Sequence, residues 1–210
     1  MARTALIRVL LVDDHFVVRV GLAGLLKRTR ACKVVAEAGA GAEAVEQYLK
    51  HRPDVMLLDR RLPDIPGEEV VARLRQADAQ ARVIMLSIDE GEEDIHRSLA
   101  AGALGYLPKS VGSSELLEAI EAVLAGKVYV AKRLRDRLEA RQRRPALSPR
   151  ELDVLRHIVE GGSNREIAVA LGLSEDTVKV HVSHILQKLA VEDRTRAVTT
   201  AIARGIVHLE

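Results

Sequence analysis

The stretch that decides the fold is the first apolar run with the two acids that end it: residues 6–14 read LIRVLLVDD. Similar short apolar runs recur at 33–36, 54–58, 82–86 and 104–107. Runs of this length without polar alternation are typical of strands that are buried on both faces of a parallel sheet. The sequence therefore predicts five buried strands in the first half of the chain.

The segments between these runs have the length and the apolar spacing of helices. Examples are 42–50, 67–76 and 91–101, and a helix over 113–125 should close the domain ahead of Gly126. Strands that alternate with helices favour an α/β architecture. We expect a doubly wound α/β domain over residues 1–126, with a five-stranded parallel sheet in the flavodoxin-like order 2-1-3-4-5.

The middle of the chain differs in charge. Residues 127–146 carry a net charge of +6, whereas residues 1–126 carry −3 and residues 147–210 carry −1. The segment is rich in arginine, has Leu134 and Leu138 one helical turn apart, and ends at Pro145. We interpret residues 127–146 as a basic, partly helical and solvated linker.

Helix-start signals follow one another from residue 147 onward. Ser148 precedes a proline at the first helical position and a glutamate three residues after the cap, and Ser163 begins a second capping box. Ser174 with the acids after it starts a third helix, and a fourth should run from about residue 194 to 204 and stop at Gly205. Residues 147–210 are therefore predicted to form an all-α domain of four helices.

Composition excludes several classes of protein. The chain has 210 residues, 48% of them hydrophobic, and no run of about 18 apolar residues that would span a membrane. The start, Met1 to Thr4, lacks the apolar region of a signal peptide. A single cysteine, Cys32, excludes an internal disulfide and a multi-cysteine metal site. We expect the protein in the cytoplasm.

Acidic residues follow the strands where ligands bind in this kind of sheet. Asp13 and Asp14 follow the first strand and Asp59 ends the third, so their carboxylates should converge at the carboxyl edge of the sheet. A hard divalent cation such as Mg²⁺ relieves the repulsion among them. Ser87 and Lys109, at the ends of the fourth and fifth strands, add a hydroxyl and an ammonium that suit phosphoryl oxygens.

These motifs together resemble the receiver domain of two-component response regulators. The matching pieces are Leu11–His15, Leu58-Asp59, Leu62–Gly67, Ser87 and Gly105–Lys109. The resemblance implies that Asp59 accepts phosphate from a sensor histidine kinase, and that Asp13, Asp14, Asp59 and the backbone carbonyl of Arg61 hold Mg²⁺. It also implies that Ser87 and Tyr106 form a switch pair, in which the hydroxyl moves onto the phosphate and the ring turns inward, with Lys109 binding the phosphate.

Two departures from the usual pattern lie beside the phosphoacceptor. Ile88 is bulky where small residues are common, and could narrow access to Asp59. Arg60 and Arg61 directly follow Asp59. One interpretation is that both arginines point to solvent. The alternative hypothesis is that Arg61 pairs with Asp89 across the mouth of the pocket and slows loss of the phosphoryl group.

Residues 164–189 have the pattern of a helix, a tight turn and a second helix. One face of the second helix is apolar, as expected for a core, and is made up of Val178, Val182, Ile185, Leu186 and Leu189. Val180 lies on the opposite face. An outward valine is an ordinary surface residue by itself, but on a recognition helix it can contact thymine methyl groups.

This half of the chain, residues 147–205, resembles the DNA-binding domain of the LuxR/FixJ (NarL-like) regulators. The signature comprises residues 147–151, 164–168, 173–174, 177–182, 185, 188–189, 191 and 194–198. The resemblance implies that bases are contacted by Lys179, Val180 and Ser183, and phosphates by Thr177, His184 and Lys188. It also implies that the last helix pairs two subunits through Ala197, Thr200, Ala201 and Arg204.

The domain's net negative charge suggests that DNA affinity depends on the basic linker or on dimerisation. We expect a homodimer on promoter DNA, with RNA polymerase as a further candidate partner and no membrane partner. The resemblance implies that the receiver blocks the recognition helix until it is phosphorylated.

Two other classes of function share some of these features. An Mg²⁺-dependent phosphatase or phosphotransferase would also begin with an acylphosphate at Asp59. However, no second acid follows two residues later and no substrate-binding cap is evident. A binding protein that works without phosphorylation is the other alternative, although all the acidic ligands are present. We therefore expect a transcriptional regulator that is not an enzyme.

Overall fold

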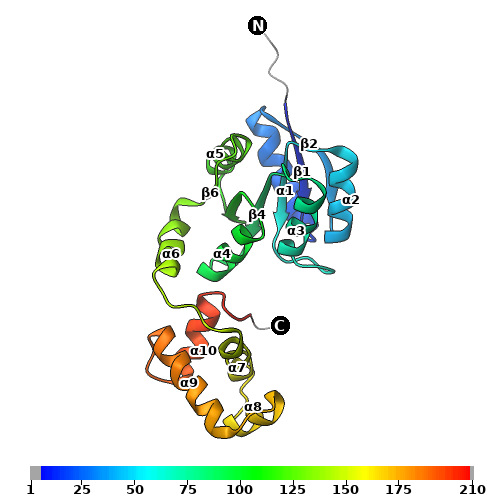
Figure 1. Cartoon of the computed structure of the whole chain (residues 1–210). Coiled ribbons are helices and arrows are strands. Elements are labelled where there is room, and N and C mark those ends of the chain that lie inside the picture. The colour runs from blue at the N-terminus through cyan, green and yellow to red at the C-terminus, as the bar shows by residue number, and fades with distance from the viewer. Residues whose placement is uncertain (1–5, 209–210) are drawn as a thin grey trace. The chain divides into compact units, whose positions relative to one another are not determined.

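The computed structural model describes residues 6–208, so the predicted absence of a signal sequence at Met1 to Thr4 lies outside the described residues (Figure 1). The chain divides into two compact units. The first unit takes in the residues up to Asp89 and Ile95–Arg135, and the second takes in Glu90–Asp94 and the residues from Asp136 onward. Across residues 6–208, no helix has both the length and the apolar character needed to cross a bilayer.

A six-stranded parallel sheet forms the centre of the first unit, in the order β2-β1-β3-β4-β5-β6. The strands are β1 (Ile7–Val12), β2 (Cys32–Ala38), β3 (Val55–Asp59), β4 (Val83–Ser87), β5 (Gly105–Pro108) and β6 (Tyr129–Val130). Every residue of β3, β4 and β5 is buried, because helices cover both faces of the sheet. The five predicted strands and their order are confirmed.

Five helices connect these strands. They are α1 (Phe16–Thr29), α2 (Gly41–His51), α3 (Gly67–Ala77), α4 (Glu92–Ala100) and α5 (Ser113–Leu124). Helix α1 packs beside α5, and α2 beside α3 (Figure 1). Each helix returns the chain to the amino edge of the sheet, so every strand delivers its last residues to the same carboxyl edge.

Strand β6 and the start of the next helix lie beyond the predicted boundary after residue 126. Strand β6 adds to the sheet beside β5, with the amide of Tyr129 donating to the carbonyl of Leu104 at 2.8 Å. The next helix is α6 (Lys132–Gln142), and Leu134 in its first turn is fully buried. The first part of the predicted linker therefore belongs to the first unit, because β6 and Leu134 complete its core.

Four helices follow in the second unit: α7 (Pro149–Val159), α8 (Asn164–Leu171), α9 (Glu175–Leu189) and α10 (Arg194–Ala203). Both predicted capping boxes are present, at Ser148 with Glu151 and at Ser163 with Glu166. The Ser174 side chain accepts a hydrogen bond from the amide of Thr177 and so caps α9. Capping satisfies amides that the first turn of a helix leaves without partners.

The core of the second unit draws on all four of these helices. Its buried members are Val154, Leu155, Ile158, Ile167, Ala168, Val178, Ile185, Leu189, Ala197 and Ala201. The predicted core face of α9 is therefore correct in Val178, Ile185 and Leu189, while Val182 and Leu186 are partly buried against the same cluster.

Two of the residues predicted for dimerisation, Ala197 and Ala201, lie in the core of the second unit. Both are fully buried in this core, so their small side chains allow α10 to pack closely on its own domain. Thr200 and Arg204 are partly buried. The η2 nitrogen of Arg204 donates to the carbonyl of Leu189 at 3.2 Å.

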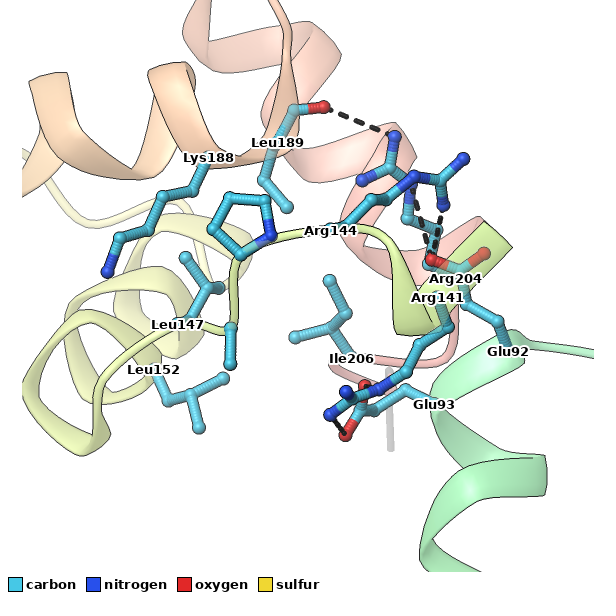
Figure 2. A pocket seen from close by; sticks show the side chains of 12 residues that line it. Glu92, Glu93, Arg141, Arg144, Leu147, Leu152, Lys188, Leu189, Arg204 and Ile206 are labelled. Carbon is cyan, nitrogen blue, oxygen red and sulfur yellow. Dashed lines mark hydrogen bonds and ion pairs between the residues drawn. The ribbon is translucent and has the colours of Figure 1, made fainter. Parts of the chain in front are cut away.

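The second unit has a cavity of about 80 Å³. Figure 2 shows the side chains that line it. Ion pairs line one side of it: Arg141 lies 3.1 Å from Glu93, and Arg144 pairs with Glu92. Two arginines of the predicted linker, Arg141 and Arg144, thus have acidic partners here. This reduces the excess of positive charge that was expected to support DNA binding.

Candidate functional site

Three carboxylates meet at the carboxyl edge of the sheet, as predicted. Asp13 follows β1 and Asp59 ends β3; both are buried, whereas Asp14 is more exposed. Together with His15 they present ligand atoms that all lie within 4.8 Å of one another. The fold brings these acids together although 46 positions separate Asp13 from Asp59.

His15 is a member of this cluster that was not assigned a role from sequence. Its Nδ1 lies 2.6 Å from Asp14 Oδ1, and its amide donates to Asp13 Oδ1 at 2.9 Å. The only signal in the sequence is its position directly after the two aspartates. Imidazole is a weaker ligand than carboxylate for a hard cation, so the histidine acts here as a partner of the acids.

Lys109 bridges the two buried acids. Its Nζ lies 2.7 Å from Asp13 Oδ2 and 2.7 Å from Asp59 Oδ2. Burial raises the pKa of the Asp59 carboxyl, and the repulsion from Asp13 adds to this, although Lys109 works in the opposite direction. Burial alone would lower the pKa of Lys109, but its hydrogen bonds to both acids outweigh burial and raise it.

Three carboxylates against one lysine leave an excess of negative charge at this edge. Asp13, Asp14 and Asp59 offer the oxygen ligands that Mg²⁺ prefers, so the residues present fit a divalent cation. The amide of Arg61 donates to Asp59 Oδ1 at 3.3 Å, which places the main chain of Arg61 at the cluster. Two of the three acids are buried, so a cation would relieve repulsion that water cannot screen.

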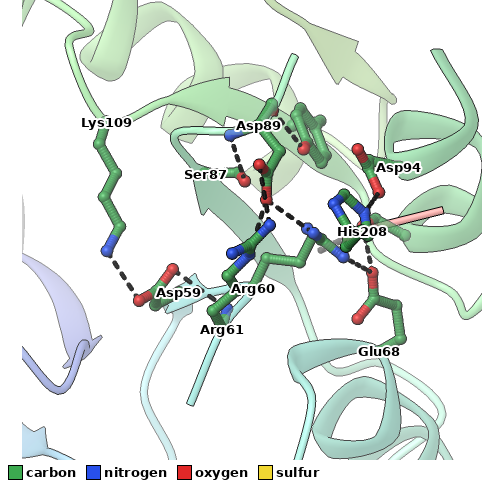
Figure 3. A network of polar contacts seen from close by, with 11 residues as sticks. Asp59, Arg60, Arg61, Glu68, Ser87, Asp89, Asp94, Lys109 and His208 are labelled. Carbon is green, nitrogen blue, oxygen red and sulfur yellow. Dashed lines mark hydrogen bonds and ion pairs between the residues drawn. The ribbon is translucent and has the colours of Figure 1, made fainter. Parts of the chain in front are cut away.

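Ser87 and Tyr106 are joined through one residue of the β4–α4 loop (residues 88–91). The amide of Asp89 donates to Ser87 Oγ at 3.0 Å, and the Tyr106 hydroxyl donates to the carbonyl of Asp89 at 2.8 Å (Figure 3). The ring of Tyr106 is already fully buried in this structure. The neighbouring Ile88 is 72% exposed, so its side chain points away from the protein.

The predicted pair between Arg61 and Asp89 is confirmed. Arg61 Nε lies 2.9 Å from Asp89 Oδ2, and its η2 nitrogen lies 3.1 Å from Asp89 Oδ1, a two-point contact. The interpretation that both arginines point to solvent is wrong, because Arg60 is only 8% exposed. Its guanidinium lies between Asp89, at 2.7 Å, and Glu68, at 3.5 Å (Figure 3).

In the second unit, α8 and α9 form the predicted helix-turn-helix. Helix α8 ends at Gly172, whose φ of 64° lets the chain turn sharply before Ser174 caps α9. Five of the six residues expected to contact DNA are exposed along α9: Thr177, Lys179, Val180, Ser183 and His184. Val180 is 53% exposed, so an apolar side chain faces outward on this helix as predicted.

The sixth residue, Lys188, is tied to another helix. Its Nζ lies 2.7 Å from Oε2 of the buried Glu151, the same carboxylate that completes the capping box of α7. Burial alone would raise the pKa of Glu151, but the hydrogen bonds from Lys188 and from Ser148 outweigh it and lower the pKa. Lys179 also has an acidic neighbour, Asp176, at 3.0 Å.

Comparison with known proteins finds two family matches, one in each half of the chain. Residues 9–121 match the response regulator receiver domain, and residues 145–201 match the bacterial regulatory proteins of the luxR family. The transcriptional regulatory protein DegU of Brevibacillus brevis is 36% identical, with 97% of this chain and 96% of DegU covered. The response regulator protein VraR of Staphylococcus aureus is 34% identical, with 96% and 99% covered.

Among solved structures, the response regulator ChrA of a heme-sensing two-component system is 36% identical to this chain. The match covers 97% of this chain and 100% of ChrA, with a TM-score of 0.58. The similarity therefore extends over both units.

Proposed function

Because the chain belongs to the response regulators that join a receiver domain to a LuxR-type DNA-binding domain, we propose that Asp59 is its phosphoacceptor. Its relatives are DNA-binding transcriptional regulators and not enzymes. The observation that carries the proposal is the placement of Asp59, buried at the end of β3 with Lys109 at 2.7 Å and Asp13 close by. Modification of this carboxylate switches DNA binding by the second unit.

The phosphoryl donor is a sensor histidine kinase. A carboxylate oxygen of Asp59 bonds to the phosphorus as the bond to the histidine nitrogen of the kinase breaks, and the electron pair leaves with the imidazole. Mg²⁺, held by Asp13, Asp14, Asp59 and the backbone carbonyl of Arg61, would offset the negative charge of the phosphoryl oxygens. The Lys109 ammonium binds one of those oxygens.

Ser87 and Tyr106 carry the signal away from Asp59. The Ser87 hydroxyl now accepts a hydrogen bond from Asp89, and it is free to donate its own proton to a phosphoryl oxygen. Movement of Ser87 toward that oxygen displaces Asp89, which the Tyr106 hydroxyl also binds. The β4–α4 loop is thus the bistable element that phosphorylation biases.

The DNA partner is a promoter duplex read by α9. Lys179, Val180 and Ser183 face the bases, and Thr177, His184 and Lys188 approach phosphates. Two chains bind as a homodimer on paired half-sites, and RNA polymerase is a further partner. The protein therefore acts in the cytoplasm, where it meets both the catalytic part of the kinase and the promoter.

Footprinting of the whole genome with wild type and Asp59→Ala tests the switch. Wild type treated with acetyl phosphate and Mg²⁺ should gain the mass of one phosphoryl group and protect specific sites, whereas Asp59→Ala should do neither. Asp136→Ala, at an exposed carboxylate of α6, is the matched control and should behave as wild type. Identical footprints for wild type and Asp59→Ala would contradict the proposal.

A second pair of variants tests whether α9 is the helix that binds the duplex. Val180→Asp places a negative charge on the outward face of α9 and should abolish protection of the sites. Val128→Asp makes the same change at an exposed valine of the first unit and should leave protection intact. Equal effects of the two substitutions would exclude α9 as the surface that binds the duplex.

A further inference from the structure

We propose that Arg60 is a positioning residue that couples the β4–α4 loop to helix α4 through Glu68 and Ser98. The inference rests on the proposed function, since it concerns how the effect of phosphorylation at Asp59 is transmitted beyond the carboxylate cluster. Arg60 directly follows Asp59, yet its side chain turns away from the carboxylate cluster and is buried under α3 and the loop.

A continuous series of polar contacts leads from the loop to α4 (Figure 3). The carboxylate of Asp89 accepts from the η2 nitrogen of Arg60 at 2.7 Å. The other arm of the same guanidinium lies 3.5 Å from Glu68 Oε1 on α3. That oxygen accepts a hydrogen bond from the Ser98 hydroxyl of α4 at 3.2 Å.

Charge and burial make this arrangement selective for arginine. Arg60 pairs with both Asp89 and Glu68, and Arg61 pairs with Asp89. Only a planar guanidinium reaches two acids in fixed directions from one buried position. Ser98 is fully buried, so its hydroxyl has no bulk water to replace Glu68.

Displacement of the loop should therefore be felt at α4. When Ser87 turns toward a phosphoryl group, the amide of Asp89 must follow or lose its acceptor, and the carboxylate of Asp89 moves with it. Arg60 then has to change its position relative to Glu68, and Glu68 its contact with Ser98. This route is separate from Tyr106, which meets the loop at the Asp89 carbonyl.

Methyl NMR on the full-length protein with labelled isoleucine measures this coupling. Ile88 reports on the loop and Ile95, buried in α4, reports on the helix. Mg²⁺ with beryllofluoride, a phosphoryl analogue, is the probe. In wild type both methyl signals should shift with the same midpoint. In Arg60→Met, a neutral side chain of similar length, Ile88 should still shift and Ile95 should lose its shift.

Matched variants separate coupling from a general loss of structure. Ser98→Ala removes only the far end of the series and should also abolish the Ile95 shift, which keeps the test available if Arg60→Met does not fold. Arg73→Met removes an exposed arginine of α3 that pairs with Glu69 at 2.9 Å, and should respond as wild type.

The outcomes are distinguishable. A full Ile95 shift in both Arg60→Met and Ser98→Ala would overturn the role of Arg60 while leaving Asp59 as phosphoacceptor. Loss of the Ile95 shift in Arg73→Met would overturn it as well, because the effect would not be specific to the series. No shift of either methyl in wild type would contradict the proposed function itself.

Discussion

The Tyr106 hydroxyl donates a hydrogen bond of 2.8 Å to the backbone carbonyl of Asp89, and the ring that carries it is fully buried. A side chain of β5 thus holds the main chain of the β4–α4 loop. The loop is held a second time by Arg60 and Arg61 at the Asp89 carboxylate. The main chain of Asp89 is therefore held from β5, and its side chain from the two residues that follow β3.

Tyr106→Phe should lower the free energy of unfolding of the first unit by about 1 kcal/mol, because the partly buried carbonyl of Asp89 loses a donor while the ring still fills its site. Urea unfolding followed by circular dichroism measures the change. A midpoint equal to that of wild type would mean that the Asp89 carbonyl finds another donor.

Asp59→Asn should raise the unfolding midpoint of the protein in EDTA. The pKa of Asp59 is raised in the fold, chiefly by burial, so its charged form costs stability at neutral pH, and that cost disappears as the pH falls through the folded pKa. Addition of Mg²⁺ should stabilise wild type more than the variant. Asp136→Asn, at an exposed position, is the control; a lower midpoint for Asp59→Asn would contradict the prediction.

Glu151→Gln should destabilise the second unit at neutral pH but much less in acid. The fold lowers the pKa of Glu151 from its ordinary value of 4.5, so the carboxylate contributes stability above that value, and the contribution is lost as the pH falls through the folded pKa. Thermal unfolding over a pH series measures the difference from wild type. Glu192→Gln, at an exposed glutamate, should show no such trend; a difference for Glu151→Gln that stays constant with pH would exclude this account.

Ala190→Gly should stabilise the second unit by about 1 kcal/mol, because Ala190 ends α9 with a φ of 56°, where a Cβ is strained. Gly172→Ala, at a φ of 64° with open space around the site, should cost a similar amount. Opposite shifts in thermal midpoint for the two changes are expected, and shifts of the same sign would contradict the argument.

Much of the fold could be predicted from sequence because its signals are local. Each of these signals spans only a few neighbouring residues: an apolar run predicts a strand, and a serine cap predicts the start of a helix. Strand β6 was missed because two residues carry no periodicity. Its pairing with β5 depends on residues far away in the chain.

The site divides in the same way. Strand ends predicted the meeting of Asp13 with Asp59, since all parallel strands finish at one edge. The burial of Arg60 depends on how α3 and the β4–α4 loop pack, and nothing in the sequence separates it from Arg61. The inward position of Ala197 and Ala201 likewise follows from the core around α10. A helix with small residues on one side has the same pattern whether it pairs within or between chains.

Glu151 has two roles at once: its carboxylate completes the capping box at the start of α7, and it forms an ion pair with Lys188 of α9, the helix expected to bind DNA. The Lys188 ammonium must break this ion pair before it can reach a DNA phosphate. A substitution of Lys188 that changes which DNA sequence is bound would consequently also lower the folding stability of the second unit. The binding surface and the scaffold cannot be altered independently at this point of the domain.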